Sequence, residues 1–144
     1  MHDQTVTLYN YHAPTGLWYT TVLENVTLTA ARSSNNTQHG TTNSDTVELS
    51  IPADGNKVVD TMQGPRQYVG PKSYAAQDTP SIYFTFWPEH DFIVSGICPL
   101  EQPVSEDDYD NGLYHEINRE QDEVYMITAA SFYGLIPHFE VEGR

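Results

Sequence analysis

The chain has 144 residues and carries 20 acidic against 6 basic side chains, so its formal charge is −14 at pH 7. A surface of this sign repels phosphate, which argues against a role in wrapping DNA. The length fits a single domain spanning residues 1–144, and with one cysteine that domain has no internal disulfide framework.

The composition favours strands over helices. Aromatic residues make up 12 % of the chain, and they gather with Val and Thr in short runs separated by Gly, Pro, Asn and Asp. We therefore expect a mainly β fold, a small antiparallel β-barrel or sandwich with one short helix and long loops.

The first two strands are indicated by alternation. In residues 5–12, Val6 and Leu8 share one face and Thr7 shares the other with Tyr9. Residues 13–16 form a turn sequence, and residues 17–31 continue as a long strand. Because only a few turn residues separate them, the two strands should pair as an antiparallel hairpin.

A polar segment follows at residues 32–45. Its side chains are almost all small and polar, so it buries too little apolar surface to fix its backbone. We expect a mobile loop that becomes ordered on assembly, with Asn35, Asn36 and His39 as candidate interface residues.

The middle of the chain is harder to interpret. Residues 46–51 alternate as a strand that Pro52 ends. Between residues 57 and 80 several Gly-Pro and Thr-Pro pairs interrupt the pattern. We expect mostly extended loop in that stretch, with one short strand at most.

Residues 82–87 and 92–95 are dense in β-branched and aromatic side chains. The four residues between them suit a hairpin turn. The core should run through Phe84, Phe86, Phe92 and Val94.

The acidic segment at residues 103–122 carries the helical signal. Ser105 followed by Asp108 resembles a capping box, and Tyr109, Leu113 and Ile117 are spaced by four residues. We expect one short helix here, with its own acidic residues stabilising the N-terminus. A calcium loop is the alternative, but the acidic residues do not have the spacing of an EF-hand.

The last part of the chain, residues 124–144, predicts a strand, a turn at Tyr133-Gly134 and a second strand. Neither strand carries a recognisable catalytic signature. Taken alone, this segment predicts a stiff hairpin with one packed face.

The chain offers little chemistry. Its six histidines do not form the spaced pair of zinc hydrolases, and only His90-Asp91 and His138 with Glu140 bring a histidine next to an acid. Nucleophile elbows and phosphate loops are also lacking. We expect Cys98 to be a buried apolar thiol, and we expect no enzyme activity, no catalytic residue, no cofactor and no metal.

The chain also offers no targeting segment. Its first residues lack a basic stretch followed by an apolar one, and no apolar run is long enough for a membrane span. We expect a protein that is made in a cytoplasm and does not enter a membrane.

Four aromatic residues admit two interpretations. Trp18, Tyr19, Phe132 and Tyr133 could stack on sugars, which would make the chain a carbohydrate-binding β-module. The alternative is that alternating aromatics simply pack the core of a small sheet.

Both ends of the chain resemble one family. The opening TVTLYNYHAPTGLWYTTVLENVTLTA and the closing DEVYMITAASFYGLIPHFEVEGR are similar to the two ends of small phage and prophage virion proteins, and Phe92-Ile93-Val94-Ser95-Gly96 resembles their middle strand. These proteins are usually described as minor capsid proteins of long-tailed phages. The resemblance covers about half the chain.

The resemblance implies a structural virion protein of the phage neck, a head-completion or stopper-like ring subunit. Its partners would be further copies in a ring of six or twelve, neighbouring connector or adaptor proteins and tail proteins. Genome DNA would pass through the channel without specific binding. A tail-terminator and a capsid-decorating protein are the alternatives within virions.

The closing turn departs from the family, in which this turn is often basic. Here Ser131, Phe132, Tyr133 and Gly134 are neutral, so we expect Phe132 and Tyr133 to contact protein and not DNA. The acidic side chains of such a ring would keep DNA from adhering to its lumen.

Overall fold

The computed structural model describes residues 3–32, 45–98 and 103–144. Six strands close into an antiparallel β-barrel in the order β1-β7-β9-β10-β3-β2, because β2 pairs back with β1. The expected mainly β fold is confirmed, and of the two expected architectures the barrel is the one formed. The barrel strands are β1 (Gln4–His12), β2 (Leu17–Arg32), β3 (Asp45–Pro52), β7 (Phe92–Ser95), β9 (Val124–Tyr133) and β10 (His138–Gly143).

The long strand β2 serves two neighbours in turn. Its first part pairs with β1 as the expected hairpin, and its second part pairs with β3 from Thr27 onwards. Between the two parts Asn25 adopts a positive φ of 58°, a conformation that Asn tolerates better than most residues. The change of direction lets one strand contribute to both sides of the barrel. A short strand, β8 (Val104–Ser105), pairs with the start of β2.

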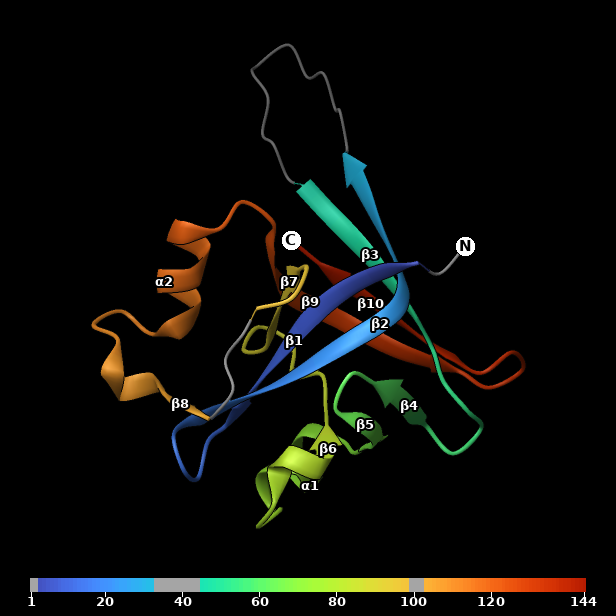
Figure 1. The fold of residues 1–144 in the computed structure, drawn as a ribbon, viewed down its shortest axis with the longest axis horizontal. Helices are drawn as coiled ribbons and strands as arrows, with labels where there is room; N and C mark the ends of the chain where they lie inside the picture. The colour runs from blue at the N-terminus through green and yellow to red at the C-terminus, as the bar shows by residue number, and fades with distance from the viewer. Residues whose placement is uncertain (1–2, 33–44, 99–102) are drawn as a thin grey trace.

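A second, three-stranded sheet lies beside the barrel and corrects one prediction (Figure 1). Residues 57–80 were expected to be mostly loop, but they form two strands and a short helix. Tertiary pairing stabilises β5 despite its Gly64-Pro65 start, because β4 flanks it on one side and β6 on the other. The elements are β4 (Val58–Thr61), β5 (Gly64–Tyr68), α1 (Pro71–Ala75), the 3-10 helix η1 (Pro80–Ile82) and β6 (Tyr83–Phe84).

The expected hairpin between residues 82–87 and 92–95 is wrong. Strand β6 pairs in parallel with β5 in the small sheet, whereas β7 lies between β1 and β9 in the barrel. The density of β-branched and aromatic side chains indicated both segments, although only Tyr83–Phe84 of the first is a strand. Their partners were decided by distant strands, which spacing along the chain does not reveal.

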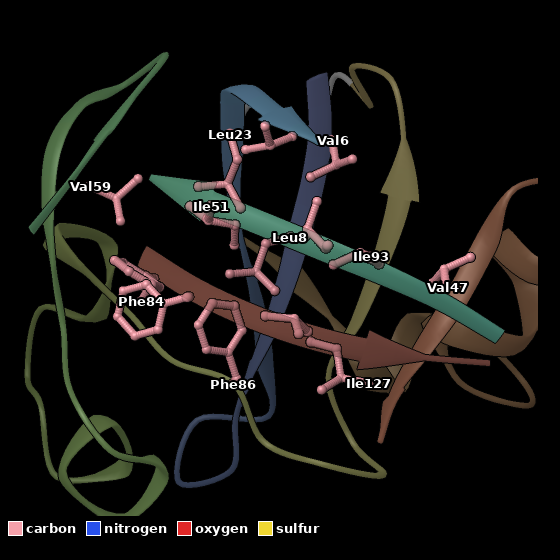
Figure 2. Packing of buried hydrophobic residues seen from close by; sticks show 14 residues of the cluster. Val6, Leu8, Leu23, Val47, Ile51, Val59, Phe84, Phe86, Ile93 and Ile127 are labelled. Atoms are coloured by element: carbon pink, nitrogen blue, oxygen red, sulfur yellow. The ribbon is translucent and has the colours of Figure 1, made fainter. Parts of the chain in front are cut away.

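The barrel interior is filled by apolar side chains. Figure 2 shows Leu8, Ile51, Phe86 and Ile93 among those that point into the space between the strands. The whole cluster consists of Val6, Leu8, Leu23, Val26, Val47, Leu49, Ile51, Val59, Phe84, Phe86, Ile93, Ile127, Phe139 and Val141. Burial of these side chains is the main source of stability for the barrel.

A second apolar cluster joins the helical segment to the barrel. Tyr9 stacks on Phe92 with ring centroids 4.5 Å apart, and the rings of Trp18 and Phe92 are 5.1 Å apart. Leu113 and Ile117 of helix α2 (Leu113–Glu120) pack against this group. All four expected core residues are buried, but Phe92 and Val94 belong to this cluster and not to the barrel interior.

The expected helix begins later than the capping-box pattern indicated. Ser105 caps only a short 3-10 helix, η2 (Glu106–Asp108), and Tyr109 is extended. Helix α2 starts after Gly112, whose φ of 88° turns the chain. The carboxylate of Glu106 accepts hydrogen bonds from Leu113 N (2.7 Å) and from Trp18 Nε1 (3.1 Å), so the effective cap comes from a side chain seven residues upstream.

Gly143 is expected to tolerate no larger residue. An added Cβ would lie 3.1 Å from Met126 O, 3.1 Å from Tyr125 Cβ and 3.2 Å from Val47 Cγ2. We expect Gly143→Ala to lower the free energy of unfolding by about 1 to 3 kcal/mol, measured by urea denaturation. Gly55→Ala is the control, since nothing lies within 4 Å of its added Cβ. Equal stability of the two variants would contradict the tight packing at Gly143.

Candidate assembly surface

The turn between β9 and β10 presents apolar side chains to solvent. Leu135 is 98 % exposed, Ile136 is 76 % exposed and Tyr133 is 48 % exposed. In Figure 1 this turn extends beyond the body of the barrel, on the side away from α2. We call Tyr133, Leu135 and Ile136 the hairpin tip. Neighbouring exposed apolar side chains of this size mark sites that contact another molecule.

The hairpin behind the tip is held stiffly. Phe132 packs against Phe139 with ring centroids 5.0 Å apart, and the ammonium of Lys57 lies 5.3 Å from the centre of the Phe132 ring. Tyr133 stacks on His138 with centroids 5.2 Å apart. The backbone of Ala53 donates a hydrogen bond to Pro137 O at 3.2 Å. A partner would therefore meet a tip that is already ordered.

The expected interface residues have different positions. Tyr133 is exposed, as an interface residue requires, whereas Phe132 is half-buried beneath Lys57. Asn35, Asn36 and His39 lie outside the described residues, as does the expected loop apart from its ends, where Arg32 pairs with Asp45.

Sequence reasoning missed Leu135 and Ile136. The signal was present, because residues 134–137 read Gly-Leu-Ile-Pro where a turn of this kind is usually polar. Two consecutive apolar residues at a hairpin turn have no side of the sheet on which to pack. Such a turn indicates an exposed contact.

Beside the tip, the outer face of the barrel is hollowed and acidic. A hollow of about 180 Å³ is lined by side chains of β2, β3, β9 and β10, and these include Glu48, Glu140 and Glu142. Glu142 lies directly opposite Glu48 in the strand register, and like charges in this position destabilise a sheet. The three carboxylates give this face a strong negative potential.

These carboxylates also act on Tyr133 of the hairpin tip. The pKa of the Tyr133 phenol is raised above its usual value, chiefly by the charge of Glu140 and also by Glu142 and Glu48. Among the described residues, Glu140 has only His138 as an ionic neighbour, at 3.7 Å, and neither Glu48 nor Glu142 has an ion pair. A cation brought by a partner would relieve this repulsion.

A buried polar network lies elsewhere, at Asp91. Its carboxylate accepts hydrogen bonds from Asn10 Nδ2 (2.8 Å), Tyr11 N (2.9 Å) and Trp87 N (3.1 Å). Asn10 Nδ2 also donates to Thr85 O at 2.6 Å. Asp91 is fully buried, so these bonds anchor the segment before β7 to strand β1. The contacts are structural, and the sequence showed only the pairing with His90.

A family model matches residues 1–144. The chain belongs to the DUF6751 family, a family of unknown function. No curated protein matches the chain, and no solved structure does. Membership in DUF6751 therefore assigns no activity to the chain.

In the part of this DUF6751 chain that the structure describes, no group of three or more His, Cys, Asp or Glu side chains is placed to hold a metal ion. None of the helices in residues 3–32, 45–98 and 103–144 combines the length and apolar character that crossing a bilayer needs.

Cys98 of the DUF6751 chain is half-buried, so the expectation of a buried thiol is wrong. It packs against the second apolar cluster, and its sulfur lies 3.8 Å from Gln121 Nε2. The residue follows the end of β7, where its backbone N–H bonds to Thr7 Oγ1 at 3.0 Å.

Asp91 should make stability of the DUF6751 chain depend on pH. Burial raises the pKa of the Asp91 carboxyl to about 7, although its three N–H donors favour the ionised form. The unfolded carboxyl titrates near 4, so the folded state holds a proton that the unfolded state has lost between about pH 4 and pH 7. This contribution is fully present below pH 4 and is lost as the pH rises to about 7.

The comparison is between wild type and Asp91→Asn, which removes the titrating group. Urea denaturation at a series of pH values should show the free energy of unfolding falling more steeply with rising pH in the wild type, by an amount of the order of 4 kcal/mol over the whole range. The other carboxylates are common to both proteins and cancel. Parallel profiles would show that folding leaves the pKa of Asp91 unchanged, which would contradict the prediction.

Proposed function

We propose that this protein is a structural virion protein of the phage neck, a head-completion or stopper-like ring subunit that joins head and tail. The observation that carries the proposal is the hairpin tip, where Leu135 and Ile136 stand exposed on an ordered hairpin. A closed barrel supplies a stiff body, and an exposed apolar tip supplies a contact for a neighbour. The resemblance of both chain ends to minor capsid proteins supports a place in the phage neck.

The acidity of the chain agrees with such a position. With a formal charge of −14, copies around a channel would repel the phosphates of passing DNA. Partners would be further copies in a ring of six or twelve and the neighbouring connector and tail proteins. Synthesis would take place in the host cytoplasm before incorporation into the virion.

The sugar-binding alternative has less support. Of the four aromatic residues that suggested it, Trp18 is only 3 % exposed, while Tyr19 and Phe132 are half-buried. Tyr133 is exposed, but one face of its ring is stacked on His138. These four residues therefore do not form a flat platform for a sugar ring.

The test is removal of the gene from the phage that encodes it, followed by electron microscopy of the particles. A neck subunit predicts heads filled with DNA that carry no tails, together with free tails of normal length. A density map of complemented particles should place the chain between portal and tail.

Other particle phenotypes would contradict the proposal. Free tails of abnormal length would indicate a tail-terminator, and normal tailed particles with fragile heads would indicate a capsid-decorating protein. A chain that is absent from particles, monomeric and able to bind oligosaccharide would indicate a carbohydrate-binding module.

A further inference from the structure

We infer that the hairpin tip of one copy docks beside the three-stranded sheet of the next copy, at Met62, Ile82 and Lys72. This inference rests on the proposed ring, and it assigns the two surfaces that would join its subunits. The occupant of the receiving surface is a second copy of this chain.

The first argument is apolar exposure. Outside the hairpin tip, the large apolar side chains exposed in the described part of the chain are Met62 (47 %), Ile82 (55 %) and Ile97 (56 %). Two of the three border the small sheet, since Met62 lies in the turn between β4 and β5 and Ile82 ends η1, directly before β6. The border of the small sheet therefore offers Leu135 and Ile136 two exposed apolar side chains to contact.

The two segments that carry Met62 and Ile82 both contact strand β2. Met62 N donates a hydrogen bond to Val22 O at 2.9 Å, which places the turn against β2. The helix η1, which ends at Ile82, also contacts β2. Both apolar side chains are thus carried by segments that lie against β2.

The second argument is charge. Residues 53–80 contain three acidic and three basic side chains and are neutral overall, which leaves 17 of the 20 acidic but only three of the six basic side chains for the rest. In this segment Lys72 of α1 is exposed and, among the described residues, has no ion pair. The face beside the hairpin tip has the opposite character, with Glu48, Glu140 and Glu142.

The hairpin tip and the receiving surface are complementary in apolar character and in charge. Apolar Leu135 and Ile136 would meet apolar Met62 and Ile82, and Lys72 would approach the carboxylates beside the tip. Residues 103–123, with eight acidic and one basic side chain, would instead repel that face. Residues 53–80, with three charges of each sign, admit an acidic neighbour at a lower electrostatic cost than those residues do.

The symmetry of this contact suits a ring. The tip and the receiving surface are different parts of the chain: in Figure 1 the β9–β10 turn extends to the right, whereas α1 lies at the bottom. A contact between two different surfaces is head-to-tail, so each copy keeps one free tip and one free receiving surface until the ring closes. A contact of one surface with itself would stop at a dimer.

The experiment uses the purified full chain, with mass in solution measured over a wide range of concentration. The tip variant carries Leu135→Ser and Ile136→Ser, and the receiving variant carries Met62→Ser and Ile82→Ser. Ile97→Ser is the matched control, an exposed apolar residue outside both surfaces. All replaced side chains are exposed, so folding should be retained, which circular dichroism and thermal unfolding would verify.

The wild type and Ile97→Ser should assemble with the same midpoint concentration. Each double variant should raise that midpoint by at least about tenfold, because two apolar contacts are lost. Lys72→Glu should raise it as well, and added salt should reduce the difference from wild type.

A mixture of the two double variants gives the sharpest result. The tip variant keeps an intact receiving surface and the receiving variant keeps an intact tip, so together they should form a heterodimer and nothing larger. Each variant alone should stay monomeric at the same concentration.

The failure of this inference differs from the failure of the proposed function. If wild type assembles and the double variants assemble equally well, or if their mixture gives no heterodimer, the assigned surfaces are wrong while the ring remains. If wild type stays monomeric at every concentration and is absent from the neck in particle maps, the ring proposal fails with it.

Discussion

Replacement of Asp91 by Ala is expected to lower the free energy of unfolding by about 3 to 4 kcal/mol at pH 7. The carboxylate accepts three N–H groups, from Asn10, Tyr11 and Trp87. After the substitution Tyr11 N and Trp87 N would lose their acceptor, and Asn10 Nδ2 would keep only Thr85 O. An unsatisfied buried donor costs about 1 to 3 kcal/mol, which is more than the hydrogen bond itself contributed.

Asp91 also makes backbone hydrogen bonds, so we expect its replacement to destabilise the whole fold. Asp91 N donates to Trp87 O at 2.9 Å, and Ile127 N donates to Asp91 O at 3.0 Å. The residue thus connects strand β1 through its side chain to strand β9 through its backbone. Loss of its side chain would loosen the start of β7, which lies between those two strands.

Asp54→Ala is the matched control for this prediction. Its carboxylate also accepts backbone N–H groups, from Asn56 at 2.8 Å and Val58 at 2.9 Å, but Asp54 is exposed. Water can replace those bonds, so we expect a loss of no more than about 1 kcal/mol. Urea denaturation of both variants gives the comparison, and equal losses would show that burial is not what makes Asp91 important.

Phe139→Ala should have a comparable effect, about 3 to 5 kcal/mol. The ring lies at the centre of an aromatic cluster, with centroids 5.0 Å from Tyr68, 5.0 Å from Phe132, 5.4 Å from Phe86 and 5.8 Å from Phe84. Its strand belongs to the barrel, whereas Tyr68 and Phe84 belong to the small sheet. The substitution would open a cavity at the junction of the two sheets.

The control for Phe139 is Phe139→Leu, which keeps most of the apolar volume and should cost less than about 1.5 kcal/mol. Thermal unfolding followed by circular dichroism measures both variants. If Ala and Leu were equally tolerated, the junction between barrel and small sheet would not depend on this ring. The small sheet would then have to be held by other contacts.

Much of the fold could be predicted from local patterns. Alternation located β1, β2 and β3 closely, and the closing hairpin had its strands and turn in the expected places. These elements carry their own signals, because a strand with one buried face must alternate. Their pairing was also local wherever a short turn joined them.

Pairing between distant segments could not be predicted. Strand β7 was assigned a hairpin partner nearby, but it pairs with β1 and β9, which lie far away along the chain. The cap of α2 was assigned to Ser105, but it is supplied by Glu106 across the turn at Gly112. In both cases the local sequence offered a suitable partner nearby. The partner that forms depends on contacts with distant strands, with β1 and β9 for β7 and with Trp18 of β2 for Glu106.

The candidate assembly surface was predicted in part. Sequence pointed to the last turn as a protein contact and named Tyr133, which is exposed. It also named Phe132, which packs inward, and it passed over Leu135 and Ile136. Exposure depends on which side chains the neighbouring strands and Lys57 cover, and that is a property of the tertiary structure.

The sequence by itself determined that this protein is mainly β and strongly acidic, because composition and alternation can be read over a few residues. Only the tertiary structure decided that the strands close into a barrel, that Asp91 is buried among three donors, and that two apolar side chains remain uncovered at a hairpin tip. Each of these depends on contacts between segments far apart in the chain, where burial and not local preference sets the free energy.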